Sequence, residues 1–192
     1  MKSIIVYTDG ACSNNPGGPG GWAATLNYDD RYDVISGHSV STTNNRMELT
    51  AVVESIKYLI NKNYKNIIIN SDSAYVINGI NKGWIYEWAK QGWRTKQGNE
   101  LANSDLWKEL YKYYTMSNVN IIFNKVAGHS GHTFNDIADE EAKKEVEHAK
   151  RKLFKKHSKA PNWMQDMLYK ASIQRYKASI QKQVAQHCKV NN

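Results

Sequence analysis

Hydrophobic periodicity divides residues 1–150 into short strand-like and longer helical segments, and their order leaves few folds open. Three strand-like segments come first, with a loop rich in Gly, Pro and Asn between the first two, which predicts an antiparallel meander. Helical segments and two further strands follow, giving the order βββαβα(α)αβα with one optional helix. This order predicts an α/β fold with a mixed sheet and helices on its faces. The expected strands are residues 4–8, 21–28, 34–40, 66–70 and 121–123, and the expected helices are 47–60, 74–81, 105–114 and 135–152.

The positive charge of the chain is concentrated in its C-terminal segment. The net charge is +8, and residues 151–192 hold ten of the 26 Lys and Arg against one of the 18 Asp and Glu. Basic segments neutralise phosphates and release counterions, so nucleic acid is the leading partner. Acidic proteins, an anionic membrane surface or a merely solubilising role are the weaker alternatives. We therefore expect a catalytic domain over residues 1–150 and a basic, helical extension over residues 151–192.

The extension contains a short internal repeat. Tyr-Lys-Ala-Ser-Ile-Gln occurs at residues 169–174 and again at 176–181, and this offset of seven places one helical stripe along Tyr169, Ile173, Tyr176 and Ile180. The stripe could pack on the core, pair with a second chain or present a basic face to a duplex. Two repeats are fewer than the three or four heptads that indicate a coiled coil. We expect a monomer, with docking onto the core or onto nucleic acid.

Composition also bears on the class of protein. No apolar run approaches the roughly 20 residues that span a bilayer, and the first residues lead directly into a strand-like segment without a signal-peptide pattern. Only Cys12 and Cys188 are present, so a disulfide framework is not expected. These features predict a protein of the cytoplasm that does not insert into membranes.

Four carboxylates stand at the expected boundaries of these segments. Asp9 follows the first strand and Asp72 follows the fourth, so parallel pairing of the two strands would bring both side chains to the same edge of the sheet. Glu48 is expected in the first turn of its helix, and Asp139 near the start of the last helix. The sequence therefore predicts that all four side chains converge.

A convergence of carboxylates has a defined chemistry. Clustered acids raise one another's pKa unless a cation neutralises them. Oxygen-only ligands suit Mg²⁺ or Mn²⁺ better than Zn²⁺. Two such ions about 3.5–4 Å apart activate a water and stabilise the leaving oxygen of an in-line displacement. The pattern indicates a two-metal site for the hydrolysis of a phosphodiester.

The ordered set of motifs around these carboxylates resembles the type 1 ribonuclease H family over about residues 1–150. The resemblance implies a ribonuclease H-like α/β fold, with a mixed five-stranded sheet in βββαβαβα order and helices on both faces. It also implies cleavage of the RNA strand of RNA/DNA hybrids to 5′-phosphate and 3′-hydroxyl ends, with two Mg²⁺ ions and Mn²⁺ as a substitute. The motifs are Thr8-Asp9-Gly10, Thr43-Asn44-Asn45-Arg46-Met47-Glu48-Leu49, Asp72-Ser73 and Gly128-His129-Ser130-Gly131.

The resemblance assigns catalytic roles residue by residue. Asp136 competes with Asp139 on proximity, but the family pattern requires an Asn followed four residues later by an Asp, which Asn135 and Asp139 satisfy. Asn135 and Asp139 also share a helical face from which Asp136 is turned away by about 100°. His129 matches the family's mobile histidine, which assists product release or proton transfer. The implied metal ligands are Asp9, Glu48, Asp72 and Asp139.

Substrate contacts are implied in the same way. A hybrid-specific enzyme must recognise the 2′-hydroxyl of the RNA strand, and the residues that match this role are Cys12, Asn15, Asn44 and Asn45, with Asn135 beside them. Thr43 and Asn103 match a pocket for a DNA phosphate, and Trp84 matches an aromatic floor under the deoxyribose strand. Trp88 is better explained by helix packing.

The sequence departs from the family pattern mainly where affinity is concerned. The loop at residues 13–21 has one extra glycine, and the segment after Trp88 is only modestly basic. The C-terminal extension has no counterpart in the minimal family domain, and we expect it to supply nucleic-acid affinity instead. The alternative functions are a hybrid-binding module without activity, and another nuclease or integrase of the same fold.

Overall fold

The computed structural model describes residues 3–28, 31–116, 118–128 and 133–158. Its centre is a five-stranded sheet in the order β3-β2-β1-β4-β5. The strands are β1 (Ile4–Cys12), β2 (Gly20–Tyr28), β3 (Arg31–Ser39), β4 (Asn66–Ser71) and β5 (Asn120–Lys125), and the helices are α1 (Asn44–Asn61), α2 (Ala74–Asn81), α3 (Trp84–Lys90), α4 (Ser104–Tyr114) and α5 (Thr133–Ser158).

The pairing of the strands confirms the predicted mixed sheet. β1, β2 and β3 form an antiparallel meander. β4 pairs in parallel with β1 on one side and with β5 on the other. The crossover through α1 brings β4 beside β1, so Thr8 is the partner of Ser71 and both strands run toward the same edge. This register places Asp9 and Asp72 in neighbouring positions.

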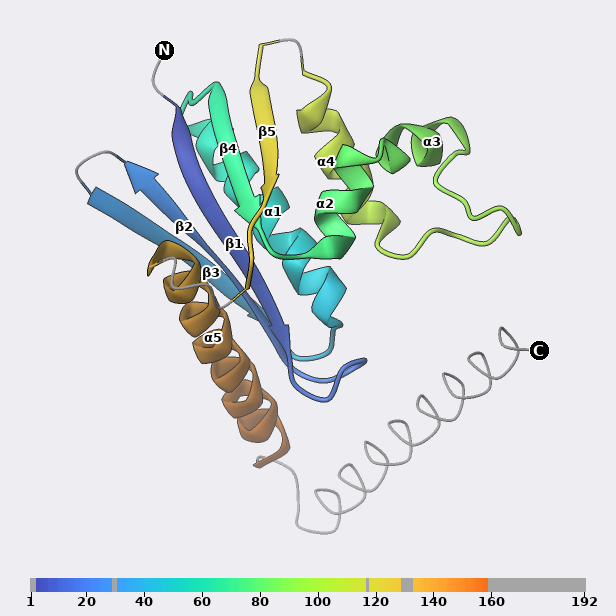
Figure 1. Cartoon of the computed structure of the whole chain (residues 1–192). Coiled ribbons are helices and arrows are strands. Elements are labelled where there is room, and N and C mark those ends of the chain that lie inside the picture. The colour runs from blue at the N-terminus through green and yellow to red at the C-terminus, as the bar shows by residue number, and fades with distance from the viewer. Residues whose placement is uncertain (1–2, 29–30, 117, 129–132, 159–192) are drawn as a thin grey trace.

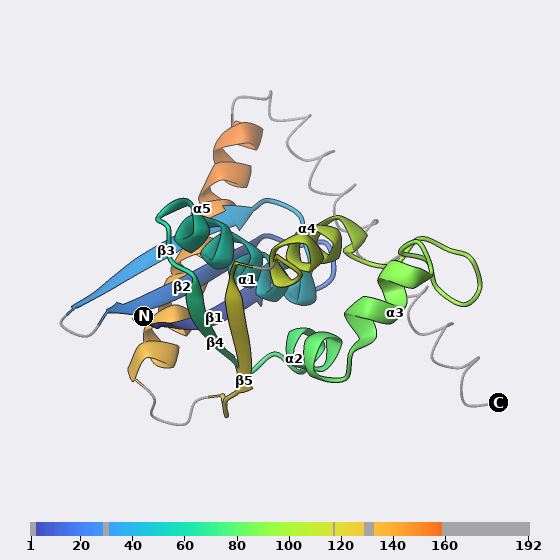
Figure 2. The ribbon, with the colours of Figure 1, turned by 90° about the horizontal axis from the view of Figure 1, so that it is seen from above.

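Helices cover both faces of the sheet, as predicted. α5 lies across β1, β2 and β3 on one face, and α1 packs against β1 and β2 on the other (Figure 1). α2, α3 and α4 extend past β5 on the α1 side, with α3 farthest from the sheet (Figure 2). The core between the sheet and α1 is aliphatic, and its fully buried members include Val6, Leu26, Leu49, Ile56 and Ile69.

Strand β1 is longer than expected, which corrects the placement of Asp9. The strand was expected to end at Thr8, but β1 continues to Cys12 because β2 pairs with it as far as Gly20. Asp9 therefore lies inside β1, opposite Ala23, rather than beyond its end. Hydrogen bonds from a neighbouring strand hold its backbone, which orients the side chain more rigidly than a loop would.

Helix α1 also begins earlier than its apolar pattern indicates. Thr43 is the N-cap, and its hydroxyl oxygen accepts a hydrogen bond from the Arg46 backbone N–H at 3.2 Å. The helix starts at Asn44, so Glu48 lies one turn inside it rather than in the first turn. The polar residues of that first turn carry no apolar signal, which is why periodicity missed it.

Two further features bear on the predicted boundaries. The optional helix is present as α3, Trp84–Lys90. α5 continues to Ser158 and crosses the expected domain boundary at residue 150 without interruption. Within the residues described, no helix has the length and apolar character that a bilayer span requires.

Candidate active site

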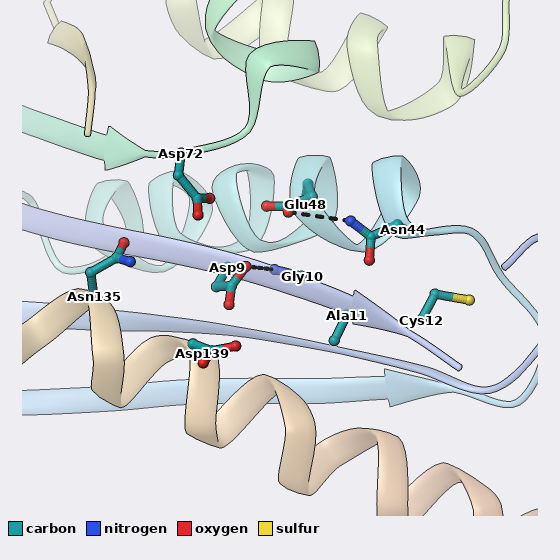
Figure 3. Close-up of a pocket in the computed structure, with 9 residues that line it drawn as sticks. All are labelled: Asp9, Gly10, Ala11, Cys12, Asn44, Glu48, Asp72, Asn135 and Asp139. Atoms are coloured by element: carbon teal, nitrogen blue, oxygen red, sulfur yellow. Dashed lines mark hydrogen bonds between the residues drawn. The ribbon is translucent and has the colours of Figure 1, made fainter. Parts of the chain in front are cut away.

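Four carboxylates from four different elements line one cleft. Asp9 comes from β1, Glu48 from α1, Asp72 from the residue after β4, and Asp139 from α5, and the four side chains point toward one another (Figure 3). The cleft has a volume of about 280 Å³. The structure thus brings together the set that the sequence predicted.

Glycines let the backbone elements approach closely enough for this convergence. A Cβ atom on Gly10 would lie 2.2 Å from the Glu48 backbone nitrogen, so α1 crosses β1 almost in backbone contact. This crossing puts Glu48 beside Asp9. A Cβ atom on Gly128 would lie 2.6 Å from Asp72 Oδ2, so the chain after β5 lies directly against that carboxylate.

Burial and mutual repulsion raise the pKa of two of the carboxyls. Glu48 is only 6% exposed, and its pKa lies well above the ordinary value because of burial first and of the nearby Asp9 and Asp72 next. Burial also raises the pKa of Asp9, to about 7, with further contributions from Asp72 and Asp139. The Gly10 backbone N–H, which donates to Asp9 Oδ1 at 2.8 Å, opposes that rise.

The cluster has the properties of a cation site. One ligand oxygen each from Asp9, Glu48 and Asp72 lies within 4.8 Å of the other two. Among the described residues, Glu48 Oε2 is buried without a hydrogen-bond partner. A buried acceptor of this kind costs free energy unless a donor or cation satisfies it. The donor set is carboxylate oxygen throughout, which fits a hard divalent cation.

The fourth carboxylate is held by its own helix. Lys143 Nζ donates to Asp139 Oδ2 at 2.6 Å, across one turn of α5. Lys143 was not predicted as part of the site, although its spacing of four residues from Asp139 is the sequence signal for such a pair. Asn135 lies one turn earlier on α5, is 3% exposed and also lines the cleft (Figure 3). Asp136 is not among the lining residues.

Three of the predicted RNA contacts lie at or beside the cleft. Cys12 and Asn44 line it, and Asn44 Nδ2 donates to Glu48 Oε1 at 3.5 Å. Asn15 Oδ1 accepts from the Asn44 backbone N–H at 3.0 Å, which joins the loop after β1 to the start of α1. Asn45 is exposed and lies outside the lining. Burial raises the pKa of the Cys12 thiol, which argues against a nucleophilic thiolate.

The residues predicted for the DNA strand lie outside the cleft lining, and two of them, Thr43 and Asn103, contact Arg46. The Arg46 backbone N–H donates to the Thr43 hydroxyl oxygen, and the Arg46 guanidinium donates to Asn103 Oδ1 at 3.4 Å. The same guanidinium forms a two-point ion pair with the exposed Asp105. Arg46 lies within the motif of residues 43–49, but no role was predicted for it from the sequence.

Trp84 and Trp88 differ in their surroundings. Trp84 is 40% exposed at the start of α3, and Lys82 Nζ lies 5.3 Å from its ring centroid. Trp88 packs edge-on against the fully buried Trp107, with 5.0 Å between ring centroids. Trp84 is thus available at the surface, and Trp88 belongs to the packing. His129 and the extension beyond residue 158 lie outside the described residues.

Comparison with known proteins agrees with this geometry. The ribonuclease H family profile matches residues 1–147. Ribonuclease H of Caldicellulosiruptor saccharolyticus is 47% identical over 74% of this chain and 95% of its own length. Ribonuclease H of Syntrophomonas wolfei is 45% identical over 76% of this chain and 97% of its own length.

A solved structure supports the same assignment. LC9-RNase H1, described as a type 1 RNase H with the type 2 active-site motif, superposes with a TM-score of 0.67 at 26% identity, covering 77% of this chain and 73% of that one. The chain therefore belongs to the ribonuclease H family and is an enzyme of that class, one that hydrolyses RNA in RNA/DNA hybrids.

Proposed function

We propose that the enzyme cleaves the RNA strand of hybrids by in-line attack of water at a site for two divalent cations, leaving 5′-phosphate and 3′-hydroxyl ends. The observation that carries the proposal is the set of ligand oxygens from Asp9, Glu48 and Asp72 within 4.8 Å of one another, in a cleft that Asp139 completes. Mg²⁺ is the proposed ion, with Mn²⁺ as a substitute, because every ligand is a carboxylate.

The positions of the four carboxylates indicate how the cations and the substrate would bind. When bound, the cations would lower the pKa of a water and offset the charge on the leaving oxygen. Glu48, held in α1 against Gly10, supplies a buried oxygen that no described donor satisfies. Asp72 follows β4, and Asp139 projects from α5 on the opposite face of the sheet. The phosphodiester would therefore enter between α1 and α5.

Strand selection follows from the groups that flank the carboxylates. Cys12, Asn44 and Asn135 line the cleft and are proposed to recognise the 2′-hydroxyls that distinguish RNA from DNA. Asn15 supports Asn44, because its side-chain oxygen accepts from the Asn44 backbone N–H, and Asn45 would extend the same contact surface. These neutral donors and acceptors match a hydroxyl group.

The DNA strand is proposed to lie on a neighbouring surface. Arg46, with Thr43 and Asn103 beside it, would bind a DNA phosphate, and the exposed Trp84 ring would support a deoxyribose. His129 would assist proton transfer or product release. Residues 1–150 are proposed as the catalytic domain, with residues 151–192 adding affinity.

Cleavage of labelled substrates tests the proposal. A 5′-labelled RNA/DNA hybrid should be cut internally in its RNA strand with Mg²⁺ and left intact with EDTA, while single-stranded RNA, double-stranded RNA and double-stranded DNA are spared. Asp72→Asn should reduce kcat by more than ~10³-fold. Asp136→Asn is the matched control, because Asp136 is an acidic residue of α5 outside the cleft lining, and it should retain activity.

Other outcomes would contradict the proposal in distinct ways. Tight binding of hybrid by the unaltered enzyme without cleavage would indicate a binding module. Cleavage of DNA would indicate another nuclease of the same fold. End-group analysis that found a 3′-phosphate would exclude the proposed in-line attack with a 3′-hydroxyl leaving group.

A further inference from the structure

A second cluster of metal-ligand side chains lies away from the carboxylate cleft. His38 projects from β3, the edge strand of the sheet, and Glu145 and His148 project from α5. One ligand atom from each residue lies within 4.8 Å of the other two. None of the three lines the active-site cleft.

The three side chains converge on one carboxylate. His38 Nδ1 lies 2.6 Å from Glu145 Oε2, and His148 Nδ1 lies 3.2 Å from Glu145 Oε1. The hydroxyl of Ser36, two residues before His38 on the same face of β3, donates to Glu145 Oε1 at 3.2 Å. Glu145 is therefore oriented by groups from both elements, as ligating carboxylates are in metal sites.

The backbone packing under this cluster is tight, so its geometry does not depend on flexible surface side chains alone. Gly21 of β2 is the cross-strand partner of His38. A Cβ atom on Gly21 would lie 2.2 Å from the Ala142 carbonyl oxygen and 2.6 Å from Glu145 Cβ. α5 thus rests directly on β2 at this point, and the Glu145 side chain is 13% exposed.

We propose that His38, Glu145 and His148 bind a borderline divalent cation of the Zn²⁺ class, which joins the edge strand to α5. Two imidazoles and one carboxylate are a ligand set that zinc uses with water in the fourth position. The same set is poorly matched to Mg²⁺, which prefers oxygen. The protein would then hold two chemically distinct cation sites.

The distances from the two histidines to Glu145 require only small adjustments to accept the ion. Ligands about 2.1 Å from a tetrahedral zinc lie about 3.4 Å from one another. The His148–Glu145 distance of 3.2 Å already approaches this value, and the His38–Glu145 pair must open from 2.6 Å. The side chains of His38 and His148 are 27% and 52% exposed, so both rings can move without repacking the core.

Bound metal would fix α5 to the sheet. α5 contributes Asp139 and Asn135 to the cleft, and it continues to Ser158, past residue 147 where the match to the family profile ends. A cation that joins residues 38 and 145 closes a long loop of the chain, which is the arrangement in which a cross-link restricts the unfolded state most. The expected role is stabilisation of the folded chain.

Zinc titration of the full-length protein tests this proposal. Isothermal titration with Zn²⁺, in excess Mg²⁺ to occupy the carboxylate cleft, should show one tight equivalent for the unaltered protein. His38→Asn and His148→Asn should each weaken that equivalent by about tenfold or more. Co²⁺ in place of Zn²⁺ should give a visible absorption band that the same variants lose. Zn²⁺ should raise the Tm of the unaltered protein but not that of the variants.

A matched control separates this site from the sequence pair His187-Cys188, which also offers zinc ligands. The double variant His187→Asn/Cys188→Ser should retain the tight equivalent and the Tm rise. Retention of tight binding in both His38→Asn and His148→Asn would overturn the proposal, as would its loss in the double variant alone. Circular dichroism of the apo variants would show that each remains folded.

Discussion

The pKa of Asp9 reflects the burial and the negative charge of the whole cleft. An aspartate in an unfolded chain titrates near 3.9, whereas burial and the neighbouring Asp72 and Asp139 raise the pKa of Asp9 to about 7. The folded protein therefore binds more protons than the unfolded chain between these two values. Linkage then requires that this group lowers the stability of the cation-free protein as the pH rises from about 4 to about 7.

Asp9→Asn tests that prediction. The variant should lose this part of the pH dependence, so in EDTA at pH 8 it should be more stable than the unaltered protein, by an amount on the order of 1–4 kcal/mol. Urea unfolding at pH 5 and pH 8 measures the difference. The gap should narrow in Mg²⁺, because the cation offsets the repulsion that the variant removes. An equal pH dependence in both proteins would contradict the assignment.

Arg46 leads to a second prediction about a single side chain. Its guanidinium is paired with Asp105, which is 60% exposed, so the pair contributes little to stability. If Arg46 binds a DNA phosphate, the Asp105 carboxylate competes with that phosphate for the guanidinium. Asp105→Ala should therefore tighten hybrid binding by a few-fold at low salt, about 0.2–1 kcal/mol, and Arg46→Ala should weaken it. Fluorescence anisotropy at several salt concentrations measures both.

The salt dependence of hybrid binding tests whether Arg46 contacts a phosphate. Loss of one phosphate contact should reduce the slope of log K against log salt by about one in Arg46→Ala. Lys57→Ala is the control, because Lys57 is a half-exposed cation on α1 with an acidic partner and lies about 16 Å farther along the helix axis. Equal losses of affinity in the two variants would mean that Arg46 acts only through net charge.

Among the secondary-structure elements, the crossing of β1 and α1 determines whether Glu48 reaches the cleft. A methyl group at Gly10 would meet the backbone of α1 at Glu48 and Met47, at 2.2 and 2.5 Å. Backbone cannot yield locally as the end of a side chain can. The two elements would have to separate, which would move the glutamate away from its partners.

Gly10→Ala should therefore reduce both stability and activity. We expect a loss of about 1–3 kcal/mol from overpacking, together with a fall in kcat, measured by urea unfolding and hybrid cleavage. Gly37→Ala is the matched control on β3, since the three atoms nearest to its added methyl belong to the side chain of Trp22 rather than to backbone. The control should cost less stability and leave kcat unchanged. A Gly10→Ala enzyme with normal kcat would contradict the role of this crossing.

Much of the element order followed from periodicity, and the exceptions have physical causes. The mixed sheet, the parallel pairing of β1 with β4 and the helices on both faces are confirmed. The predicted end of β1 and the predicted start of α1 were wrong. β1 is extended by pairing with β2, and α1 is started by the Thr43 cap. Both effects depend on hydrogen-bond partners rather than on the apolar pattern.

In the molecule as a whole, charge is divided between an acidic cleft and a basic C-terminal segment. Residues 151–192 hold ten Lys and Arg and one acidic residue. A cleft of four carboxylates repels phosphate, so binding of a duplex needs positive charge elsewhere on the chain. The C-terminal segment is the proposed source of this positive charge.

Neutralising the extension tests that role in the full chain. Replacing the six Lys and Arg of residues 159–192 by Gln should weaken hybrid binding and lower the salt slope, with kcat at saturating substrate unchanged. Deletion of residues 158–192 should have the same effect. Unchanged affinity and salt slope in both variants would refute the role of the extension.

Residue types and their spacing were enough to indicate the fold class, the four carboxylates and the family, because each motif carries its chemistry in a few neighbouring residues. The partnership of Arg46 with Asn103 and the cluster of His38 with Glu145 and His148 emerged only from the folded chain. Neither has a local signal, since each joins residues on elements far apart in sequence. Their distances depend on how closely helices and strands pack, and a few small residues such as Gly10 and Gly21 set that approach.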